Sequence, residues 1–233
     1  MTTLEFGGMT WIARADRSLW QPERRTLVIA DLHLAKSHAF RRAGIPISDA
    51  IERDDLTRLN QAITDTRAST LWILGDLLHS PAGLGPHIAR FLQELSLPTT
   101  AVHVILGNHD QAAAKALANA GLQTYPDPTP WESIEFAHFP ESTGHHRPRI
   151  AGHMHPMVTY RSRRDRLRFP CFAYIDEDTL VLPAFTRFSG GSDLNPRQVT
   201  CYPIVADQVL SPDGTSPTIE LDAEDSPCAD RCY

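Results

Sequence analysis

The chain has 233 residues, 42% hydrophobic and 21% charged, which is typical of a folded globular protein and excludes disorder of the whole chain. The chain has 28 acidic and 22 basic side chains. Six of the acidic and one of the basic side chains lie in residues 211–233, which leaves 22 acidic and 21 basic side chains in residues 1–210. We therefore expect one near-neutral domain over residues 1–210 and an acidic, mobile tail over residues 211–233.

The sequence shows no targeting or membrane signal. Its start lacks a charged segment followed by a continuous apolar stretch, and no later segment approaches the roughly 18 apolar residues of a membrane span. We therefore predict a cytoplasmic protein with no membrane contact. The four cysteines, Cys171, Cys201, Cys228 and Cys232, are too few for a disulfide scaffold and are expected to be reduced thiols.

The first half alternates between strand and helix patterns. Residues 26–30, 70–74 and 101–106 are short, apolar and rich in β-branched side chains, which predicts buried parallel strands. Helical periodicity lies around and between them, over residues 36–43, 49–66, 86–95 and 111–120. This alternation predicts crossover connections and a parallel sheet.

The second half contains short strand-like segments separated by Pro, Gly and Asp, without long helices. These segments are residues 131–136, 149–152, 157–160, 167–174, 179–182 and 198–205. They predict a second, mostly antiparallel or mixed sheet packed on the first. The expected fold class is therefore α/β, with two packed mixed β-sheets flanked by helices.

Side chains suited to metal binding follow the predicted strands. They occur in four ordered motifs: D-x-H at Asp31 and His33, G-D at Asp76, G-N-H-D from Gly107 to Asp110, and G-H-x-H at His153 and His155. Functional residues of open α/β sheets gather at the carboxyl ends of the strands. Carboxylate, amide and imidazole groups at one sheet edge indicate a site for two divalent metal ions.

These four motifs, in this order over about residues 26–160, resemble the calcineurin-like metallophosphoesterases. The resemblance implies a four-layer α/β/β/α sandwich and a binuclear metal site. It implies that one metal is held by Asp31, His33, Asp76 and His155, and that the other is held by Asp76, Asn108, His138 and His153. Asp76 would then bridge the two metals.

His138 is assigned by its position. The family has a lone histidine after a strand ahead of G-H-x-H, and His145 and His146 also precede that motif. We prefer His138 because the apolar residues 134–137 lead directly into it, as other strands lead into the other ligands.

Two further residues have implied catalytic roles. In the family, the position of His109 donates a proton to the leaving oxygen, and Asp110 would orient its imidazole. Hydrolysis would use a water activated by the two metals. Gly75, Gly107 and Gly152 are expected to allow close approach of the backbone at the site.

A narrower resemblance lies in residues 31–48, DLHLAKSHAFRRAGIPIS. This segment resembles a small bacterial branch related to the SbcD-type repair nucleases, the ligase-associated DNA-damage-response endonucleases of the PdeM type, which usually have Gly at the position of Ala35. The resemblance implies a manganese-dependent phosphodiesterase that nicks single-stranded DNA in repair, with an Lhr-like helicase or a DNA ligase as partner. Fe, Zn, Co and Ni also suit these ligands.

Basic side chains indicate where a phosphate backbone would bind. Arginines outnumber lysines twenty to two, and the guanidinium fork suits phosphate contacts. The candidate substrate-binding residues are Arg41, Arg42, His79, Arg161, Arg163 and Arg164, with Arg147, Arg149, Arg166 and Arg168 nearby in the sequence. A solvated hairpin face is the alternative interpretation of the cluster from Arg161 to Arg168.

Three functions therefore remain open. The first is a DNA phosphodiesterase or endonuclease, and the second is a phosphatase or pyrophosphatase acting on a small nucleotide or a lipid-linked phosphate. The third is a non-catalytic scaffold of the same fold, which would be expected to have lost ligands. All seven expected ligands are present.

Overall fold

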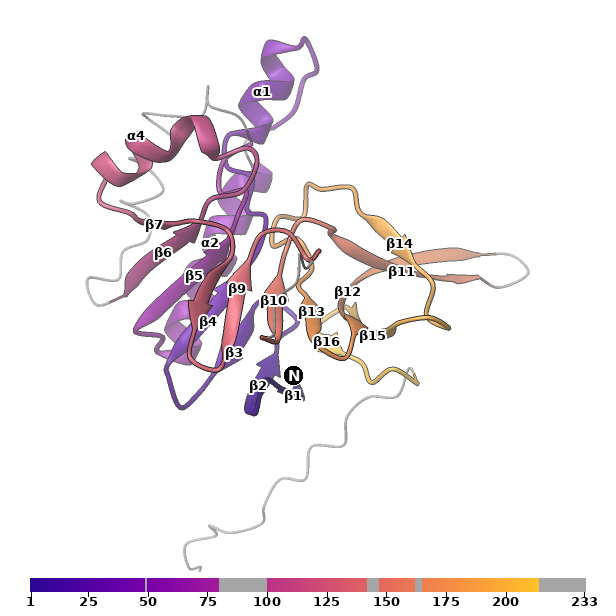
Figure 1. The fold of residues 1–233 in the computed structure, drawn as a ribbon. Helices are drawn as coiled ribbons and strands as arrows, with labels where there is room; N and C mark the ends of the chain where they lie inside the picture. Colours follow the sequence, from indigo (N-terminus) through magenta and orange to yellow (C-terminus); the bar gives the residue numbers. More distant parts are fainter. Residues whose placement is uncertain (49, 80–99, 142–146, 162–164, 214–233) are drawn as a thin grey trace, which may run out of the picture.

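The structure is a computed structural model that describes residues 1–48, 50–79, 100–141, 147–161 and 165–213. Two β-sheets pack against each other, one from each half of the chain (Figure 1). The expected helix over residues 86–95 and the expected mobile tail beyond residue 213 lie outside the described residues. Within the described residues, no helix is both long enough and apolar enough to cross a membrane.

The first sheet has the strand order β1-β2-β3-β4-β5-β6-β7. Its strands are β1 (Thr2–Phe6), β2 (Met9–Ala13), β3 (Leu19–Gln21), β4 (Thr26–Ile29), β5 (Thr70–Leu74), β6 (Ala101–Ile105) and β7 (Gln123–Tyr125). The pairings from β4 to β7 are parallel, as the sequence predicts. The antiparallel strands β1 to β3 were not predicted, because they are short and lack a continuous apolar stretch.

The second sheet is mixed and has the order β14-β11-β12-β13-β10-β9-β8, with β15 paired to β12 and β16 paired to β15. Its strands are β8 (Thr129–Trp131), β9 (Ile134–Ala137), β10 (Arg149–Ala151), β11 (Pro156–Arg161), β12 (Arg166–Asp176), β13 (Thr179–Val181), β14 (Ser192–Leu194), β15 (Thr200–Val205) and β16 (Gln208–Val209). β9, β10 and β13 run parallel, whereas β11 and β12 form an antiparallel hairpin.

The described helices all precede β7 in the chain. They are α1 (Lys36–Arg42), α2 (Ala50–Thr66), a 3-10 helix (Gln111–Ala113) and α4 (Ala114–Asn119). α2 turns Leu56, Leu59 and Ile63 into a core that it shares with the first sheet, as their spacing predicts.

A second core fills the space between the two sheets, where Trp11, Val28 and Trp72 of the first sheet meet Phe136 and Phe172 of the second. The expectation of two packed mixed sheets with helices is confirmed. The implied helical layer over the second sheet has no counterpart in the described residues. Cys171 and Cys201 are buried free thiols, and Cys228 and Cys232 lie outside the described residues.

Candidate metal centre

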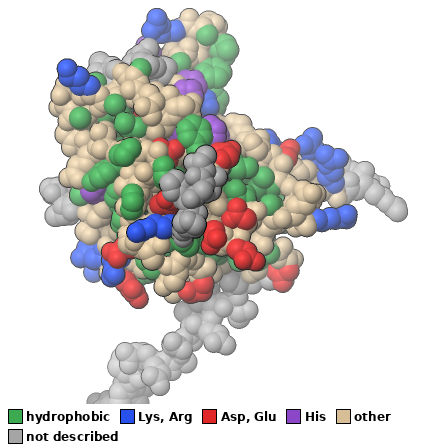
Figure 2. Space-filling view, viewed as in Figure 1, with side chains coloured by type: hydrophobic (Ala, Val, Ile, Leu, Met, Phe, Trp, Pro, Cys, Tyr) green, Lys and Arg blue, Asp and Glu red, His purple; other side chains and the backbone are tan. Residues whose placement is uncertain are grey.

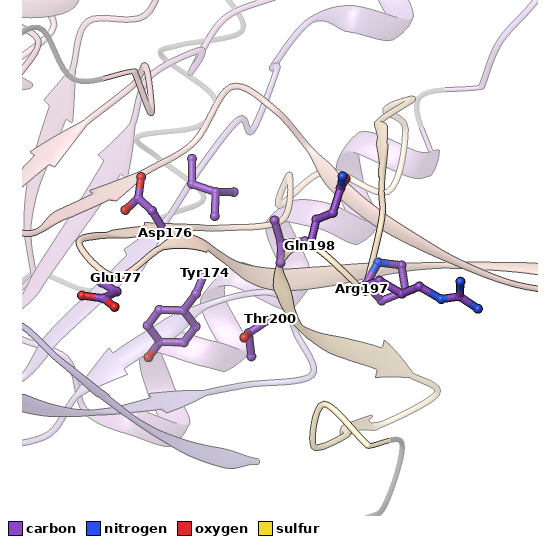
Figure 3. Close-up of a pocket in the computed structure, with 9 residues that line it drawn as sticks. Tyr174, Asp176, Glu177, Arg197, Gln198 and Thr200 are labelled. Carbon is purple, nitrogen blue, oxygen red and sulfur yellow. The ribbon is translucent and has the colours of Figure 1, made fainter.

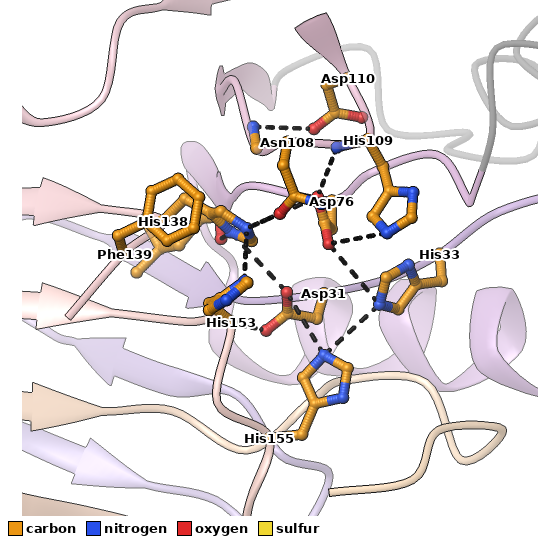
Figure 4. A network of polar contacts seen from close by, with 12 residues as sticks. Asp31, His33, Asp76, Asn108, His109, Asp110, His138, Phe139, His153 and His155 are labelled. Atoms are coloured by element: carbon orange, nitrogen blue, oxygen red, sulfur yellow. Dashed lines mark hydrogen bonds and ion pairs between the residues drawn. The ribbon is translucent and has the colours of Figure 1, made fainter. Parts of the chain in front are cut away.

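The predicted ligands all follow the carboxyl ends of strands. Because β4, β5 and β6 are parallel neighbours, and β9 and β10 are parallel neighbours in the facing sheet, these strand ends meet at one edge of the sandwich. Asp31 and His33 follow β4, Asp76 follows β5, Asn108 follows β6, His138 follows β9, and His153 and His155 follow β10. Figure 4 shows these side chains around a common centre.

The backbone is unusual at five of these residues. Asp31, His33, Asp76, His153 and His155 have φ values of 53°, 50°, 47°, 68° and 47°. This left-handed conformation costs a residue with a side chain about 1–2 kcal/mol. Backbone hydrogen bonds hold it here: the Asp31 N–H donates to the Gly75 carbonyl at 3.2 Å, and the His33 N–H donates to the Asp76 carbonyl at 2.9 Å. Strain of this kind is concentrated at functional sites.

A first cluster contains Asp31, His33 and His155. The Nε2 atoms of His33 and His155 are 3.4 Å apart, and His155 Nε2 is 3.5 Å from Asp31 Oδ1. Asp76 Oδ2 lies 3.9 Å from His33 Nε2 and so faces this cluster.

A second cluster contains Asp76, His138 and His153. His138 Nε2 lies 3.0 Å from His153 Nδ1 and 2.9 Å from Asn108 Oδ1. Asp76 Oδ1 lies 3.6 Å from the same His138 nitrogen. The two carboxylate oxygens of Asp76 therefore face different clusters.

The donor atoms have the spacing that metal ligands require. Two donors held at about 2.1 Å from one ion, at an angle between a right angle and a tetrahedral angle, lie roughly 3.0–3.4 Å apart. The nitrogen pairs at 3.0 and 3.4 Å match that spacing. Asp31 Oδ1 is buried and accepts no hydrogen bond within the described part of the chain, as expected for an oxygen directed at a cation. These residues fit two divalent metal ions.

Neighbouring groups fix the orientation of His138. Its Nδ1 lies 3.2 Å from the Leu74 carbonyl oxygen, so the Nδ1–H tautomer leaves the Nε2 lone pair free for a metal. Its backbone N–H donates to Asp127 Oδ1 at 2.8 Å. The sequence analysis did not identify Asp127, because it lies eleven residues away along the chain and in no motif.

Three glycines leave room for the ligands, as expected. A Cβ on Gly75 would lie 2.1 Å from His138 Nδ1, and one on Gly107 would lie 2.4 Å from Asp76 Oδ1. A Cβ on Gly152 would lie 2.9 Å from Asp31 Oδ2, the oxygen that accepts the His153 N–H at 2.8 Å.

Burial sets the protonation state of several ligands. It lowers the pKa of His33 to about 2, with a further decrease from the neighbouring His155, and it also lowers the pKa of His153. Burial raises the pKa of Asp76, opposed by His138 and reinforced by the charge of Asp31. His33 and His153 are therefore kept as neutral imidazoles, the form that binds metal, and a bound cation would offset the cost of the two buried carboxylates.

His109 lies beside the clusters but belongs to neither. Its Nε2 is 3.9 Å from Asp76 Oδ2, and its side chain is 38% exposed. Its backbone N–H donates to Asp76 Oδ1 at 3.1 Å.

Asp110 differs from its expected role as the residue that orients His109. Its buried carboxylate accepts three backbone N–H groups, from Leu77 at 3.2 Å, Leu78 at 3.0 Å and Gly107 at 3.2 Å. Burial raises its pKa to about 6 against these hydrogen bonds. Asp110 therefore ties the loop after β5 to the loop after β6. A carboxylate between two loops is better satisfied by backbone donors than by one partly exposed ring.

Of the candidate substrate-binding residues, His79 lies beside the candidate metal centre. Its ring stacks on His109, with centroids 5.6 Å apart, and meets the His33 ring edge to face at 5.7 Å. Arg41 and Arg42 are exposed in the last turn of α1, where Arg41 donates to the Ile47 carbonyl at 3.0 Å.

The arginine cluster lies on the β11–β12 hairpin, which extends from the body of the molecule and carries basic side chains (Figures 1 and 2). Arg161 is exposed on it, and Arg163 and Arg164 lie outside the described residues. Arg166 and Arg168 both bind Asp193, at 3.2 and 2.7 Å. Arg149 is a structural residue, because it is buried against Glu135 at 2.7 Å.

A separate hollow lies at the opposite end of the second sheet, where the end of β12 pairs with the start of β13 (Figure 3). It is lined by residues that include Tyr174, Asp176, Glu177 and Arg197. None of the predicted ligands lines it.

Comparisons with known proteins support the family that the motifs resemble. Residues 24–184 match the family model of the calcineurin-like phosphoesterases. Among solved structures, the chain is similar to the crystal structure of the nuclease MPE of Pseudomonas putida, with a TM-score of 0.71 and 29% sequence identity over 91% of this chain and 96% of that chain. A search of curated proteins finds no match.

Proposed function

Because this chain belongs to the calcineurin-like phosphoesterase family, we propose that it hydrolyses phosphodiester bonds with two bound divalent metal ions, as a nuclease acting on single-stranded DNA. The observation that carries the proposal is the position of Asp76 between two clusters of metal-binding side chains. When bound, two such ions stabilise the attacking and leaving oxygens of an in-line displacement at phosphorus.

The roles of the protein residues follow from their contacts. Asp31, His33 and His155 would hold one ion, while Asn108, His138 and His153 would hold the other, and Asp76 would bridge them. His109 is partly exposed beside Asp76 and outside both clusters, so its imidazole is available to protonate the leaving oxygen.

The similarity to the Pseudomonas putida nuclease supports the nuclease class, because it extends over 91% of this chain and 96% of that one. The exposed Arg161 and the basic hairpin favour a polyanionic substrate. Mn²⁺ is the proposed metal, since the ligand set mixes imidazole, carboxylate and amide donors. A role in DNA repair, beside an Lhr-like helicase or a DNA ligase, is the corresponding cellular proposal.

The substrate class can be tested with the purified protein loaded with Mn²⁺. Hydrolysis is compared on a bis-aryl phosphodiester, an aryl phosphomonoester and a labelled single strand of DNA. We expect cleavage of the diester and the DNA, and none after chelation of the metal. Asp76→Ala is the matched inactive control, because it removes the shared carboxylate.

Cleavage of the phosphomonoester alone would refute the nuclease proposal and favour the phosphatase alternative. Activity that survives both chelation and Asp76→Ala would refute the metal-dependent mechanism itself.

A further inference from the structure

Lys36 begins α1 three residues after the predicted ligand His33. The chain contains only two lysines against twenty arginines, and the other lysine, Lys115, lies exposed on α4. A lysine at this position therefore stands out from the general use of arginine as the basic residue.

The Lys36 ammonium is partly buried and has no carboxylate within ion-pair distance among the described residues. Its Nζ lies 5.1 Å from the centroid of the Phe188 ring, and burial lowers its pKa. Glu52 lines the same small cavity, but its Oε2 accepts hydrogen bonds from the Ala35 N–H at 3.1 Å and the Ser37 hydroxyl at 3.3 Å. A partly exposed ammonium that no carboxylate of the described residues pairs with, next to a predicted metal centre, is available to bind an anion from solution.

The charge of Lys36 changes the electrostatic environment of the candidate metal centre. After burial, it is among the causes that lower the pKa of both His33 and His79. His79 offers a second unused polar group, because its Nδ1 is buried without a hydrogen-bond partner in the described part of the chain. The Phe40 ring packs between His79, at a centroid distance of 6.2 Å, and Phe188, at 5.2 Å. Phe40 therefore connects His79 to the ring that Lys36 contacts.

We propose that the Lys36 ammonium and the His79 imidazole bind non-bridging oxygens of the phosphate that is hydrolysed, on the side of the first ligand cluster. The identity of this anion as a phosphate ester rests on the proposed function. A lysine provides a compact charge on a flexible stem with three donors, and a neutral imidazole adds one donor. Charge-assisted hydrogen bonds to phosphate oxygens are among the stronger ones in proteins.

The test uses Lys36→Met, which keeps most of the side-chain length and removes the charge, and Lys115→Met as the matched control. Binding of inorganic phosphate to each Mn²⁺-loaded protein is measured by titration calorimetry, together with the metal content. We expect Lys36→Met to weaken phosphate binding about ten- to a hundredfold, the loss of one hydrogen bond to a charged group, without loss of metal. Lys115→Met is expected to bind phosphate as the native protein does.

Thermal unfolding separates this role from a structural one. Because Lys36 has no carboxylate partner among the described residues, Lys36→Met breaks no ion pair there, and we expect its Tm to equal or exceed that of the native protein. An unchanged phosphate affinity would overturn the proposal. So would a lowered Tm or a failure to fold, since either result would make Lys36 a packing residue.

Phosphate binding requires no turnover, so this inference and the proposed function can fail separately. A protein that hydrolyses no phosphodiester, but loses phosphate affinity on Lys36→Met, would refute the proposed function and support the role of Lys36. If Lys36→Met slowed cleavage of DNA but not of the bis-aryl phosphodiester, and left phosphate affinity unchanged, Lys36 would bind a neighbouring phosphate of the strand and the proposal would be wrong.

Discussion

At the scale of single residues, Asp76 connects the two ligand clusters while His109 stays outside both. Asp76 Oδ1 and Oδ2 lie 3.6 and 3.9 Å from His138 and His33 nitrogens, whereas the His109 ring is partly exposed. Loss of either side chain should therefore lower activity, but for different reasons.

We predict that His109→Ala retains its metal and loses about 10²–10⁴ in rate, most on substrates with poor leaving groups, as expected for loss of a general acid. Asp76→Ala is predicted to lose both metal and activity. Metal content by emission spectroscopy, measured beside kcat, compares the two variants. A His109→Ala protein stripped of metal would identify His109 as a ligand instead.

Asp110→Asn separates the observed role of this residue from the role implied by family resemblance. One carboxylate oxygen, Oδ2, accepts both the Leu77 and the Gly107 N–H groups. An asparagine has a single acceptor oxygen, so its NH₂ group would leave either one or two of the three backbone donors without an acceptor. We predict a loss of at least about 1–3 kcal/mol in the free energy of unfolding, measured with urea. Unchanged stability with a reduced kcat would instead support an orienting role.

The residue types of the site were predictable from sequence, but several of their contacts were not. Asp31, His33 and His155 lie together because their motifs follow parallel strands. The Asp110 contacts and the support of His138 by Asp127 depend on loop paths, which no periodicity encodes. The same holds for Lys36, which has no carboxylate partner among the described residues. The composition gave one usable signal for Lys36, a rare lysine three residues after a ligand.

At the scale of elements, the loops after β4, β5 and β10 determine the geometry of the site. Residues in the left-handed conformation in these loops direct the ligand side chains toward the site. Glycine is required where the loop backbone lies too close to a ligand to leave room for a Cβ. Ala35 has a φ of 63°, a left-handed conformation that favours glycine, which agrees with the Gly usual at this position in the branch that residues 31–48 resemble.

Gly75→Ala tests this requirement, with Gly121→Ala as its matched control. Both glycines have positive φ, 77° and 89°, but an added Cβ meets His138 Nδ1 at 2.1 Å only at Gly75 and meets nothing within 4 Å at Gly121. Gly121→Ala should cost about 1–2 kcal/mol of backbone strain and keep its metal. Gly75→Ala should also displace His138 and lose metal from the second cluster, and equal metal content in both variants would contradict this.

At the scale of the whole molecule, the sandwich holds buried ionisable groups that the metal-free protein must keep in unfavourable states. The folded pKa of His33 is about 2 against an ordinary value of 6.5. Below about pH 6.5 the unfolded chain binds a proton at this position that the folded protein does not, so stability falls as the pH falls.

We therefore predict that the metal-free native protein loses about 1.2 kcal/mol more stability than metal-free His33→Asn between pH 6 and pH 5. Comparison with the variant removes the opposite contribution of Asp110, whose raised pKa favours the folded state in the same range. Urea unfolding in the presence of a chelator measures both slopes. Parallel slopes would show that His33 takes up its proton in the folded protein.

The architecture was predictable where the sequence carried strong periodicity. The parallel strands β4 to β6 and the helix α2 follow from apolar segments and a helical stripe. The antiparallel strands β1 to β3 extend the parallel strands to one edge of the sheet, so their short segments become strands through pairing with neighbours rather than through their own pattern.

The central claim is that two metal ions share Asp76, and anomalous diffraction at the manganese edge from crystals grown with Mn²⁺ tests it most directly. We predict two anomalous peaks, one among Asp31, His33 and His155 and the other among Asn108, His138 and His153, with the Asp76 carboxylate between them. A single peak, or two peaks away from Asp76, would contradict this account.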